Sequence, residues 1–470
     1  MRVPEWRPAL AAAHEAALEW LEGLAERPVR PDVDYDAMLE VLSEPMPEAG
    51  LPADQVIREL DKAVRPGLMA FNHGRFFGWV IGGATPAGIA ADWLVTAWDQ
   101  NTAMSGPTPG VSAVEALTAD WLLQLLDLPR TSSVAFVTGA QVANLVCLAA
   151  ARHRVLADVG WDVEADGLIG APAVTVVAGE YVHHTVGRAV RILGLGESRT
   201  VLVPADDNAR MRPDALRDAL AQISGPVIVC AQAGEIATGG IDPLGAIADI
   251  VEERRVTAPT WLHVDGAIGL FGRASTVLAP KFAGAERADS WCTDAHKWLN
   301  TPYDCGIAIV RDREAHHAAM TLTASYIPAP SAARDPIDWN PEMSRRARAT
   351  AVYATLRSLG RAGVAEIVER DCAMAQLLAE GVRALPGAEV VNEVELNQVL
   401  VRLKDPAGLD DDAHTLATLA RLQASGVAYP SGTTFRGHAA IRFSVANWQT
   451  DTDDVAETLE ALAEAHTRWG

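Results

Sequence analysis

The residues best suited to covalent chemistry lie in the segment Asp294-Ala295-His296-Lys297-Trp298. The chain has four lysines among 39 basic residues, at positions 62, 281, 297 and 404. Since arginine is used almost everywhere a cation is needed, a retained lysine calls for a chemical explanation. An amine can form an imine with a carbonyl compound, and burial can lower its pKa. Lys297 is therefore the candidate nucleophile, and the alternative is an exposed lysine at a strand end.

A candidate acid follows an apolar stretch at residues 261–264. Asp265 comes directly after it, at the expected carboxyl end of a strand, where open α/β sheets place their ligand sites. An ionised carboxylate there can hold a protonated ring nitrogen, which makes a pyridinium ring a better electron sink. The plainer alternative is that Asp265 caps the following helix.

Two further segments offer groups for an anion and for an aromatic ring. Residues 138–144 follow the apolar run 134–137 and open a helix, where small residues such as Gly139 and Ala140 let backbone amides approach a phosphate. Residues 181–189 carry His183 and His184, either of which can stack on a ring. Taken alone, each segment is weak evidence, since single histidines are usually core or surface residues.

Short strands alternating with helices must position these residues. Such alternation from Ser133 onward indicates βαβ units and a largely parallel sheet covered by helices. Up to about Arg65 the spacing predicts helices, and the helix after Ser344 leads into a mixed α+β region with strands near residues 390, 399 and 441. The predicted strands are residues 134–137, 174–177, 200–203, 227–230, 261–264, 290–293 and 307–310.

Composition narrows the classes of function. The 470 residues carry a formal charge of −22, which opposes binding to nucleic acid or to an anionic membrane. The five cysteines form no CxxC pair, so the sequence signals neither a disulfide framework nor a metal site and favours a reduced, cytoplasmic setting. We find no apolar run long enough to span a bilayer.

Taken in order, the four segments resemble the group II pyridoxal 5'-phosphate (PLP)-dependent amino acid decarboxylases, the family of aromatic-L-amino-acid, glutamate and histidine decarboxylases. Residues 294–310 resemble the family's lysine segment, and residues 261–267 its WxHVDAA strand. The resemblance covers nearly the whole chain, including residues 72–78, 91–93, 431–436 and 442–447.

The resemblance implies an α/β fold of the PLP-dependent transferase class, aspartate aminotransferase-like and of fold type I. We therefore expect a central, mostly parallel seven-stranded sheet with an N-terminal helical segment and a small C-terminal α+β domain. The implied limits are 1–65 for a helical dimerisation segment, 66–340 for the large PLP-binding domain and 341–470 for the small domain. Members of the family are homodimers with the site at the subunit interface.

The resemblance also implies residue roles. Lys297 would form the Schiff base, Asp265 would pair with the pyridine nitrogen, and His183 and Ala267 would contact opposite faces of the ring. Trp79 would touch the substrate. The remaining cofactor contacts would come from Gly139, Ala140, Gln141, Asp294 and His296, with Ser344 reaching the neighbouring subunit's phosphate.

Four positions depart from the family pattern. Gln141 stands where Ser or Thr is more common, and its amide still donates. Asp294 replaces an Asn found in some relatives. Glu235 stands where a hydroxyl or amide is also common, and a carboxylate there would repel a substrate carboxylate. Pro336 falls near the position of a tyrosine thought to protonate Cα, which leaves Tyr326 as the one tyrosine between Thr321 and Arg345.

These features predict decarboxylation of an L-amino acid to the amine and CO2, with Trp79, Phe76 and Phe77 weakly favouring an aromatic or bulky substrate. The same scaffold can support a PLP-dependent transaminase or aldehyde synthase, because fold and cofactor do not determine which Cα bond breaks. An inactive, cofactor-binding partner subunit is a third possibility, and the joint presence of Lys297, Asp265 and His183 argues against it.

Overall fold

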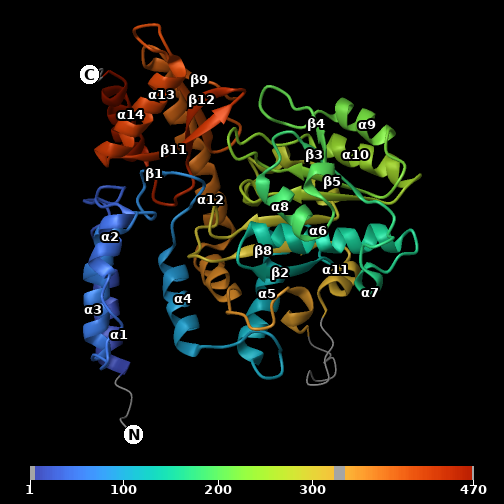
Figure 1. Ribbon diagram of the computed structural model, residues 1–470, viewed down its shortest axis with the longest axis horizontal. Helices are drawn as coiled ribbons and strands as arrows, with labels where there is room; N and C mark the ends of the chain where they lie inside the picture. Colours follow the sequence, from blue (N-terminus) through green and yellow to red (C-terminus); the bar gives the residue numbers. More distant parts are fainter. Residues whose placement is uncertain (1–5, 322–333, 468–470) are drawn as a thin grey trace.

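The computed structural model describes residues 6–321 and 334–467. The first three helices are α1 (Trp6–Glu22), α2 (Tyr35–Leu42) and α3 (Ala53–Val64). Helices α1 and α3 pack against each other, and the side chain of Asp34 caps α2 by accepting a hydrogen bond from the amide of Ala37. The sequence predicted helices up to about Arg65, and Figure 1 shows this blue helical group apart from the large sheet.

Seven strands form the larger sheet, in the order β2-β8-β7-β6-β5-β3-β4. Strand β8 is antiparallel to both of its neighbours, and the other pairings are parallel, so the predicted mostly parallel seven-stranded sheet is confirmed. The strands are β2 (Ser133–Val137), β3 (Thr175–Gly179), β4 (Val201–Val203), β5 (Val227–Gln232), β6 (Thr260–Asp265), β7 (Ser290–Asp294) and β8 (Gly306–Val310).

Helices cover both faces of this sheet, because its central strands are apolar on both sides. Along β2, Ala135 and Val137 pack into one core with α6, whereas Val134 and Phe136 pack into another with α5. The first face carries α6 (Ala140–Ala157), α7 (Val163–Asp166), α8 (His184–Ile192) and α11 (Arg313–Met320), and the second carries α5 (Pro109–Leu125), α9 (Pro213–Ala221) and α10 (Leu244–Arg255).

A second, five-stranded sheet has the order β1-β11-β12-β10-β9. Its short strand β1 comes from a segment that precedes the large sheet, and it pairs parallel to β11, whereas the other pairings are antiparallel. Helices α13 (Asp411–Ser425) and α14 (Thr452–Thr467) pack on this sheet over an apolar core. The strands are β1 (Phe76–Phe77), β9 (Ala388–Val390), β10 (Gln398–Leu403), β11 (Tyr429–Phe435) and β12 (His438–Ser444).

One long helix, α12 (Ala349–Ala384), connects the two sheets. Its residues up to Val368 pack into the core of the large sheet beside α5 and α4 (Pro86–Trp98), and its residues from Ala375 pack into the core of the small one. Gly360 interrupts the helix with φ 63° and ψ −179°, a conformation that favours glycine. The predicted domain limits, 1–65, 66–340 and 341–470, stay a prediction.

Two negative findings apply to residues 6–321 and 334–467. None of their helices is both long and apolar enough to cross a membrane. Nor do their histidine, cysteine and acidic side chains form a group of three or more that could hold a metal ion.

Candidate active site

The predicted site residues converge at one edge of the large sheet. Asp265 is the last residue of β6 and Asp294 the last of β7, and these two strands are parallel neighbours. Ala140 begins α6, and His183 caps the amino end of α8. Because parallel strands end at the same edge, residues far apart in the sequence meet there. Lys297 follows in the turn after β7.

Asp265 is buried, with 5% of its surface exposed. Its Oδ2 accepts a hydrogen bond from Nδ2 of Asn144 at 3.1 Å, and its Oδ1 accepts one from the amide of Ala267 at 3.1 Å. Burial alone would raise the pKa of Asp265, but the nearby His183 ring and these hydrogen bonds together hold it below its ordinary value. An ionised carboxylate therefore stands at the sheet edge, as a protonated ring nitrogen requires.

The structure distinguishes the two neighbouring histidines. His183 is half-buried and interacts electrostatically with Asp265, whereas His184 is exposed. Burial lowers the pKa of His183 to about 4, so its ring is neutral at neutral pH. Of the pair, His183 is thus the one placed to stack on a cofactor ring.

Lys297 lies beside a second acid. Its Nζ is 3.1 Å from Oδ2 of Asp294, and 17% of its side chain is exposed. Oδ1 of the same carboxylate accepts a hydrogen bond from the amide of Ala140 at 2.6 Å and lies 3.5 Å from Nε2 of His296. Asp294 thus connects the lysine segment to the amino end of α6.

The ring of His296 is held on two sides. Its Nδ1 accepts a hydrogen bond from the amide of Cys305 at 3.2 Å, and its ring stacks on Tyr303 with centroids 4.3 Å apart. Burial lowers the pKa of His296 and raises that of Tyr303 to about 12. His296 can therefore present a neutral Nε2–H group toward the amino end of α6.

The amino end of α6 has the features of an anion site. Gly139 approaches β8 so closely that a Cβ on Gly306 would lie 2.3 Å from the carbonyl carbon of Gly139. The Nε2 atom of Gln141 donates one hydrogen to the carbonyl of Thr185 at 3.2 Å and has a second N–H that can donate to an anion, whereas its buried, unpartnered Oε1 can only accept. Since the Ala140 amide already binds a carboxylate oxygen of Asp294, this helix end accommodates an anionic oxygen. These features fit a phosphate.

Trp79 follows β1 of the smaller sheet, three residues before Gly82, which lies against the backbone of Lys297. Its indole is 50% exposed and lies near the rings of Phe71, Phe76 and Tyr429. Its backbone has φ 48°, which is uncommon for a bulky residue, and three hydrogen bonds hold it in place. The Trp79 amide donates to Oγ of Ser431 at 2.8 Å. The Trp79 carbonyl accepts from Oγ of Ser444 at 2.7 Å and from Nη2 of Arg442 at 3.2 Å.

Arg442 is a candidate that sequence reasoning missed. It lies on β12, is 6% exposed, and its buried Nε has no hydrogen-bond partner. Burial lowers the pKa of Arg442, while the charge of Glu235 raises it. The charge of Arg442 in turn lowers the pKa of His183. The signal in the sequence was an arginine inside an apolar strand, which is costly unless an anion is bound there.

The Glu235 carboxylate is occupied within its own turn. Its Oε2 accepts hydrogen bonds from the amides of Ala237 and Thr238, both at 2.8 Å, and from the hydroxyl of Thr238 at 3.1 Å. Burial raises the pKa of Glu235, against these hydrogen bonds and the charge of Arg442. The predicted repulsion of a substrate carboxylate is therefore weakened by a neighbouring cation.

Among the residues that the structure describes, Ala267 joins this cluster, whereas Ser344 does not. Ala267 follows Asp265 and is partly exposed at the site, where it donates its amide to that carboxylate. Ser344 is exposed, and within the described chain no hydrogen bond links it to the other predicted residues. Tyr326 lies outside the described residues.

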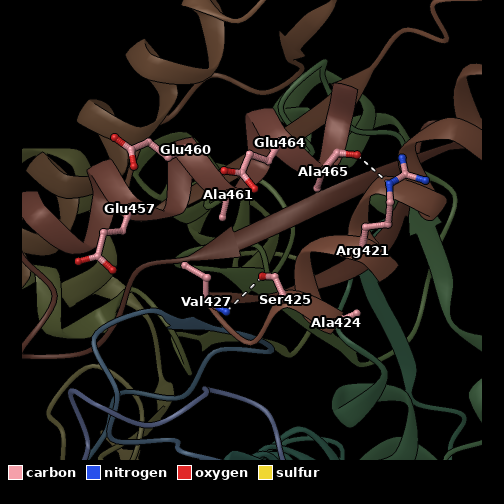
Figure 2. Close-up of a pocket in the computed structure, with 9 residues that line it drawn as sticks. All are labelled: Arg421, Ala424, Ser425, Val427, Glu457, Glu460, Ala461, Glu464 and Ala465. Atoms are coloured by element: carbon pink, nitrogen blue, oxygen red, sulfur yellow. Dashed lines mark hydrogen bonds between the residues drawn. The ribbon is translucent and has the colours of Figure 1, made fainter. Parts of the chain in front are cut away.

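A separate pocket of about 490 Å³ lies between α13 and α14 and contains none of the predicted site residues. Figure 2 shows three glutamates on its α14 side and Arg421 on α13, whose Nε donates to the carbonyl of Ala465 at 2.7 Å. Because these acids would repel a carboxylate or a phosphate, the sheet edge is the better candidate for the active site.

Comparisons with known proteins show what this chain is similar to. A family model described as "Pyridoxal-dependent decarboxylase conserved domain" matches residues 36–404. Tryptophan decarboxylase 1 of Oryza sativa subsp. japonica is 28% identical, over 96% of this chain and 91% of the relative. L-2,4-diaminobutyrate decarboxylase of Rhizobium meliloti (strain 1021) is 28% identical, over 90% of this chain and 83% of the relative. 4-hydroxyphenylacetaldehyde synthase of Rhodiola rosea is 26% identical, over 88% of this chain and 85% of the relative.

The likeness extends to three dimensions. A crystal structure of Oryza sativa TDC with PLP and tryptamine matches with a TM-score of 0.91 at 26% sequence identity, covering 99% of this chain and 98% of that chain. The predicted α/β fold of type I, with its N-terminal helices and C-terminal domain, is confirmed.

Proposed function

Since this chain belongs to the family of pyridoxal-dependent decarboxylases, we propose that it removes the α-carboxylate of an aromatic L-amino acid, with Lys297 as the residue that holds PLP. The chain is a PLP-dependent amino acid carboxy-lyase. The observation that carries the residue assignment is the ionised, buried Asp265 at the same sheet edge as the amine of Lys297.

The roles of the residues follow from their positions. When bound, PLP supplies an electron sink for the bond broken at Cα. Asp265 keeps the proton on the pyridine nitrogen, and His183 and Ala267 hold the two faces of the ring. Asp294 orients the amine of Lys297. The phosphate is held by the amino end of α6, through Gly139, Ala140 and Gln141, together with His296.

Two further residues are proposed to bind the substrate. Arg442 offers a buried cation with an unpartnered Nε, suited to the α-carboxylate. Trp79 supplies an exposed aromatic wall, which favours an aromatic side chain. The curated relatives include decarboxylases of tryptophan and of L-2,4-diaminobutyrate, so the substrate class is part of the proposal.

A panel of amino acids tests the function. Purified protein with PLP is incubated with aromatic, basic and acidic L-amino acids, and CO2 and amine are quantified. We expect an aromatic substrate to give equal amounts of both products, and Lys297→Ala to give neither. If CO2 were released only from a diaminobutyrate, the assignment as a decarboxylase would stand and the proposed aromatic specificity would be rejected.

An aldehyde synthase is the second candidate, favoured by Pro336 at the expected tyrosine position and by the Rhodiola rosea relative. Aldehyde, hydrogen peroxide and ammonia in place of amine would identify it. Where the reaction ends in the amine, we propose Tyr326 as the proton donor to Cα. Tyr326→Phe should then slow amine formation far more than it raises KM, and an unchanged rate would exclude Tyr326.

We also propose a cytoplasmic homodimer that binds neither nucleic acid nor membranes. Its N-terminal helices expose apolar side chains, including Trp6, Leu10 and Tyr35, which a second copy would cover. In such a dimer Ser344 would reach the neighbouring subunit's phosphate, and the domain limits would be 1–65, 66–340 and 341–470. The five cysteines are free. Light scattering of the full chain and of a chain lacking residues 1–65 tests the dimer.

A further inference from the structure

Asn144, one turn into α6, joins the two residues that are proposed to contact the cofactor ring. It is fully buried, and its Nδ2 donates to Oδ2 of Asp265 at 3.1 Å and to Oγ1 of Thr185 at 3.2 Å. Because a carboxylate can only accept, the amide must turn its NH2 group toward Asp265. This orientation determines the direction of every other hydrogen bond in the network.

On the sheet side, the Oδ1 atom of Asn144 accepts. Nε2 of His263 lies 2.7 Å from it and therefore carries the hydrogen. Burial lowers the pKa of His263 to about 4, so the ring is neutral and its Nδ1 accepts from the hydroxyl of Ser290 at 2.9 Å. The Ser290 oxygen in turn accepts from Nε1 of Trp261 at 2.9 Å. The amide of Asn144 is thus prevented from rotating.

On the helix side, the network ends at His183. Oγ1 of Thr185 lies 2.8 Å from Nδ1 of His183, and the Thr185 backbone N–H points at the same nitrogen at 3.4 Å. A backbone N–H only donates, so Nδ1 is the acceptor and the neutral ring carries its hydrogen on Nε2. With Nδ1 occupied inside the protein, the Nε2–H group is the end of the ring left for a bound substrate.

We propose that Asn144 is a positioning residue for the reaction, because it orients the carboxylate of Asp265 and, through Thr185, holds His183 in its Nε2–H tautomer. The inference rests on the proposed function, in which Asp265 and His183 contact the ring. A purely structural role would change stability without changing the tautomer, so the tautomer is the measurement that separates the two.

Thr185 offers an isosteric test. The full chain is labelled with ¹⁵N-histidine, and its nitrogen NMR signals are recorded before and after PLP is added, with His183→Asn used to assign the signal of His183. We expect a protonated Nε2 in the wild type and in Thr185→Ser, which keeps the hydroxyl. Thr185→Val loses the hydroxyl and keeps only the longer backbone N–H contact at 3.4 Å, so a fraction of the Nδ1–H tautomer should appear beside the Nε2–H form. Thr118→Val removes a buried hydroxyl far from the site and is the control for stability.

Asn144→Asp tests the other end of the network, because it keeps the shape and removes both donors. We expect kcat to fall by about tenfold or more with KM changed less than about twofold, and Thr185→Val to lower kcat by about fivefold. A Thr185→Val spectrum with no more of the Nδ1–H tautomer than the wild type would overturn the proposal, as would an unchanged kcat in Asn144→Asp. If Asn144→Asp fails to fold, the comparison of Thr185→Ser with Thr185→Val still tests the proposal.

Failure of the proposed function would look different. If the wild type released no CO2 from any amino acid, or if PLP were attached elsewhere than at Lys297, the reaction assignment would be lost. The tautomer of His183 in the protein without PLP would still show whether the network acts as inferred.

Discussion

Two walls of the site differ in how completely their polar groups are paired. The sheet wall, made of Asp265, Asn144, His263 and Ser290, is buried, and hydrogen bonds connect each of these residues to the next. The rim is made of Phe71, Phe76, Trp79, Tyr429 and Arg442. Its rings range from the buried Phe76 to the half-exposed Trp79, and it contains a buried guanidinium with an unpartnered Nε. Under the proposed function, the contrast separates two tasks: the wall would hold the cofactor in a fixed electrostatic environment, whereas the rim would keep binding capacity for the substrate.

Removing the proposed attachment point should have the largest effect, because neither wall can act without it. Lys297→Ala should leave the fold intact and lower turnover by on the order of a thousandfold or more. Borohydride reduction and peptide mapping should find a pyridoxyl group on Lys297 in the wild type and in the control Lys281→Ala. A pyridoxyl group on Lys281, or on no lysine, would contradict the assignment.

The sheet wall is tested next by Asp265→Ala. Truncating a buried charged partner costs about 3–5 kcal/mol, so PLP affinity and turnover should both fall steeply. Asp242→Ala is the control, since Asp242 is also buried and accepts two backbone hydrogen bonds near the same sheet edge. We expect the control to lose stability while keeping PLP affinity. Wild-type turnover of Asp265→Ala at saturating PLP would refute the electron-sink role.

The sheet wall should also make stability depend on pH. His263 is fully buried with its pKa lowered from 6.5 to about 4, so the unfolded chain binds more protons between these values. The contribution of His263 to the free energy of unfolding should therefore be fully present above about pH 6.5. It should fall by on the order of 3 kcal/mol as the pH is lowered toward 4. Asp265 acts below this window, because its pKa is lowered from 3.8.

Chemical denaturation at a series of pH values measures this dependence. His263→Gln keeps an amide donor for Asn144 and removes the titrating ring, so its curve should be flatter than that of the wild type. Arg436→Gln, at the surface where Arg436 pairs with Asp207, should leave the slope unchanged. If the free energy of unfolding had the same dependence on pH in the wild type and in His263→Gln, His263 in the sheet wall would not be the source of that dependence.

The rim predicts a change in substrate binding. Arg442→Gln should raise KM for the amino acid by about 10–100-fold, because a hydrogen bond to a charged group contributes about 1.5–3 kcal/mol, with little effect on PLP affinity. The control is Arg436→Gln, since Arg436 follows β11 at the surface and pairs with Asp207. A loss of PLP affinity in Arg442→Gln would place Arg442 with the cofactor instead.

Trp79→Leu should have the smallest effect. We expect kcat/KM to fall by about tenfold for an aromatic substrate and by less for an aliphatic one, since stacking on an aromatic ring contributes about 0.5–1.5 kcal/mol beyond burial. Trp98→Leu, which alters a similarly exposed tryptophan at the end of α4, is the control. Equal losses for both substrate types would remove Trp79 from specificity.

The sequence by itself determined the elements and the residues at their ends. Apolar runs followed by Asp265 and Asp294 predicted strands that end in acids, and the structure has β6 and β7 ending at those residues. Small residues after residue 137 likewise predicted the start of α6. These features are local, because periodicity and the chemistry of strand ends are written in a few consecutive residues.

Only the tertiary structure decided which distant side chains meet. The choice of His183 over His184 depends on how α8 packs against α6, which brings His183 near Asp265. The place of Arg442 depends on how β12 pairs with β11 next to Trp79. Asn144 was visible in the sequence without a role, since its partners Asp265 and Thr185 lie 121 and 41 positions away. Burial and hydrogen-bond direction arise from packing across such separations, and no short sequence pattern encodes them.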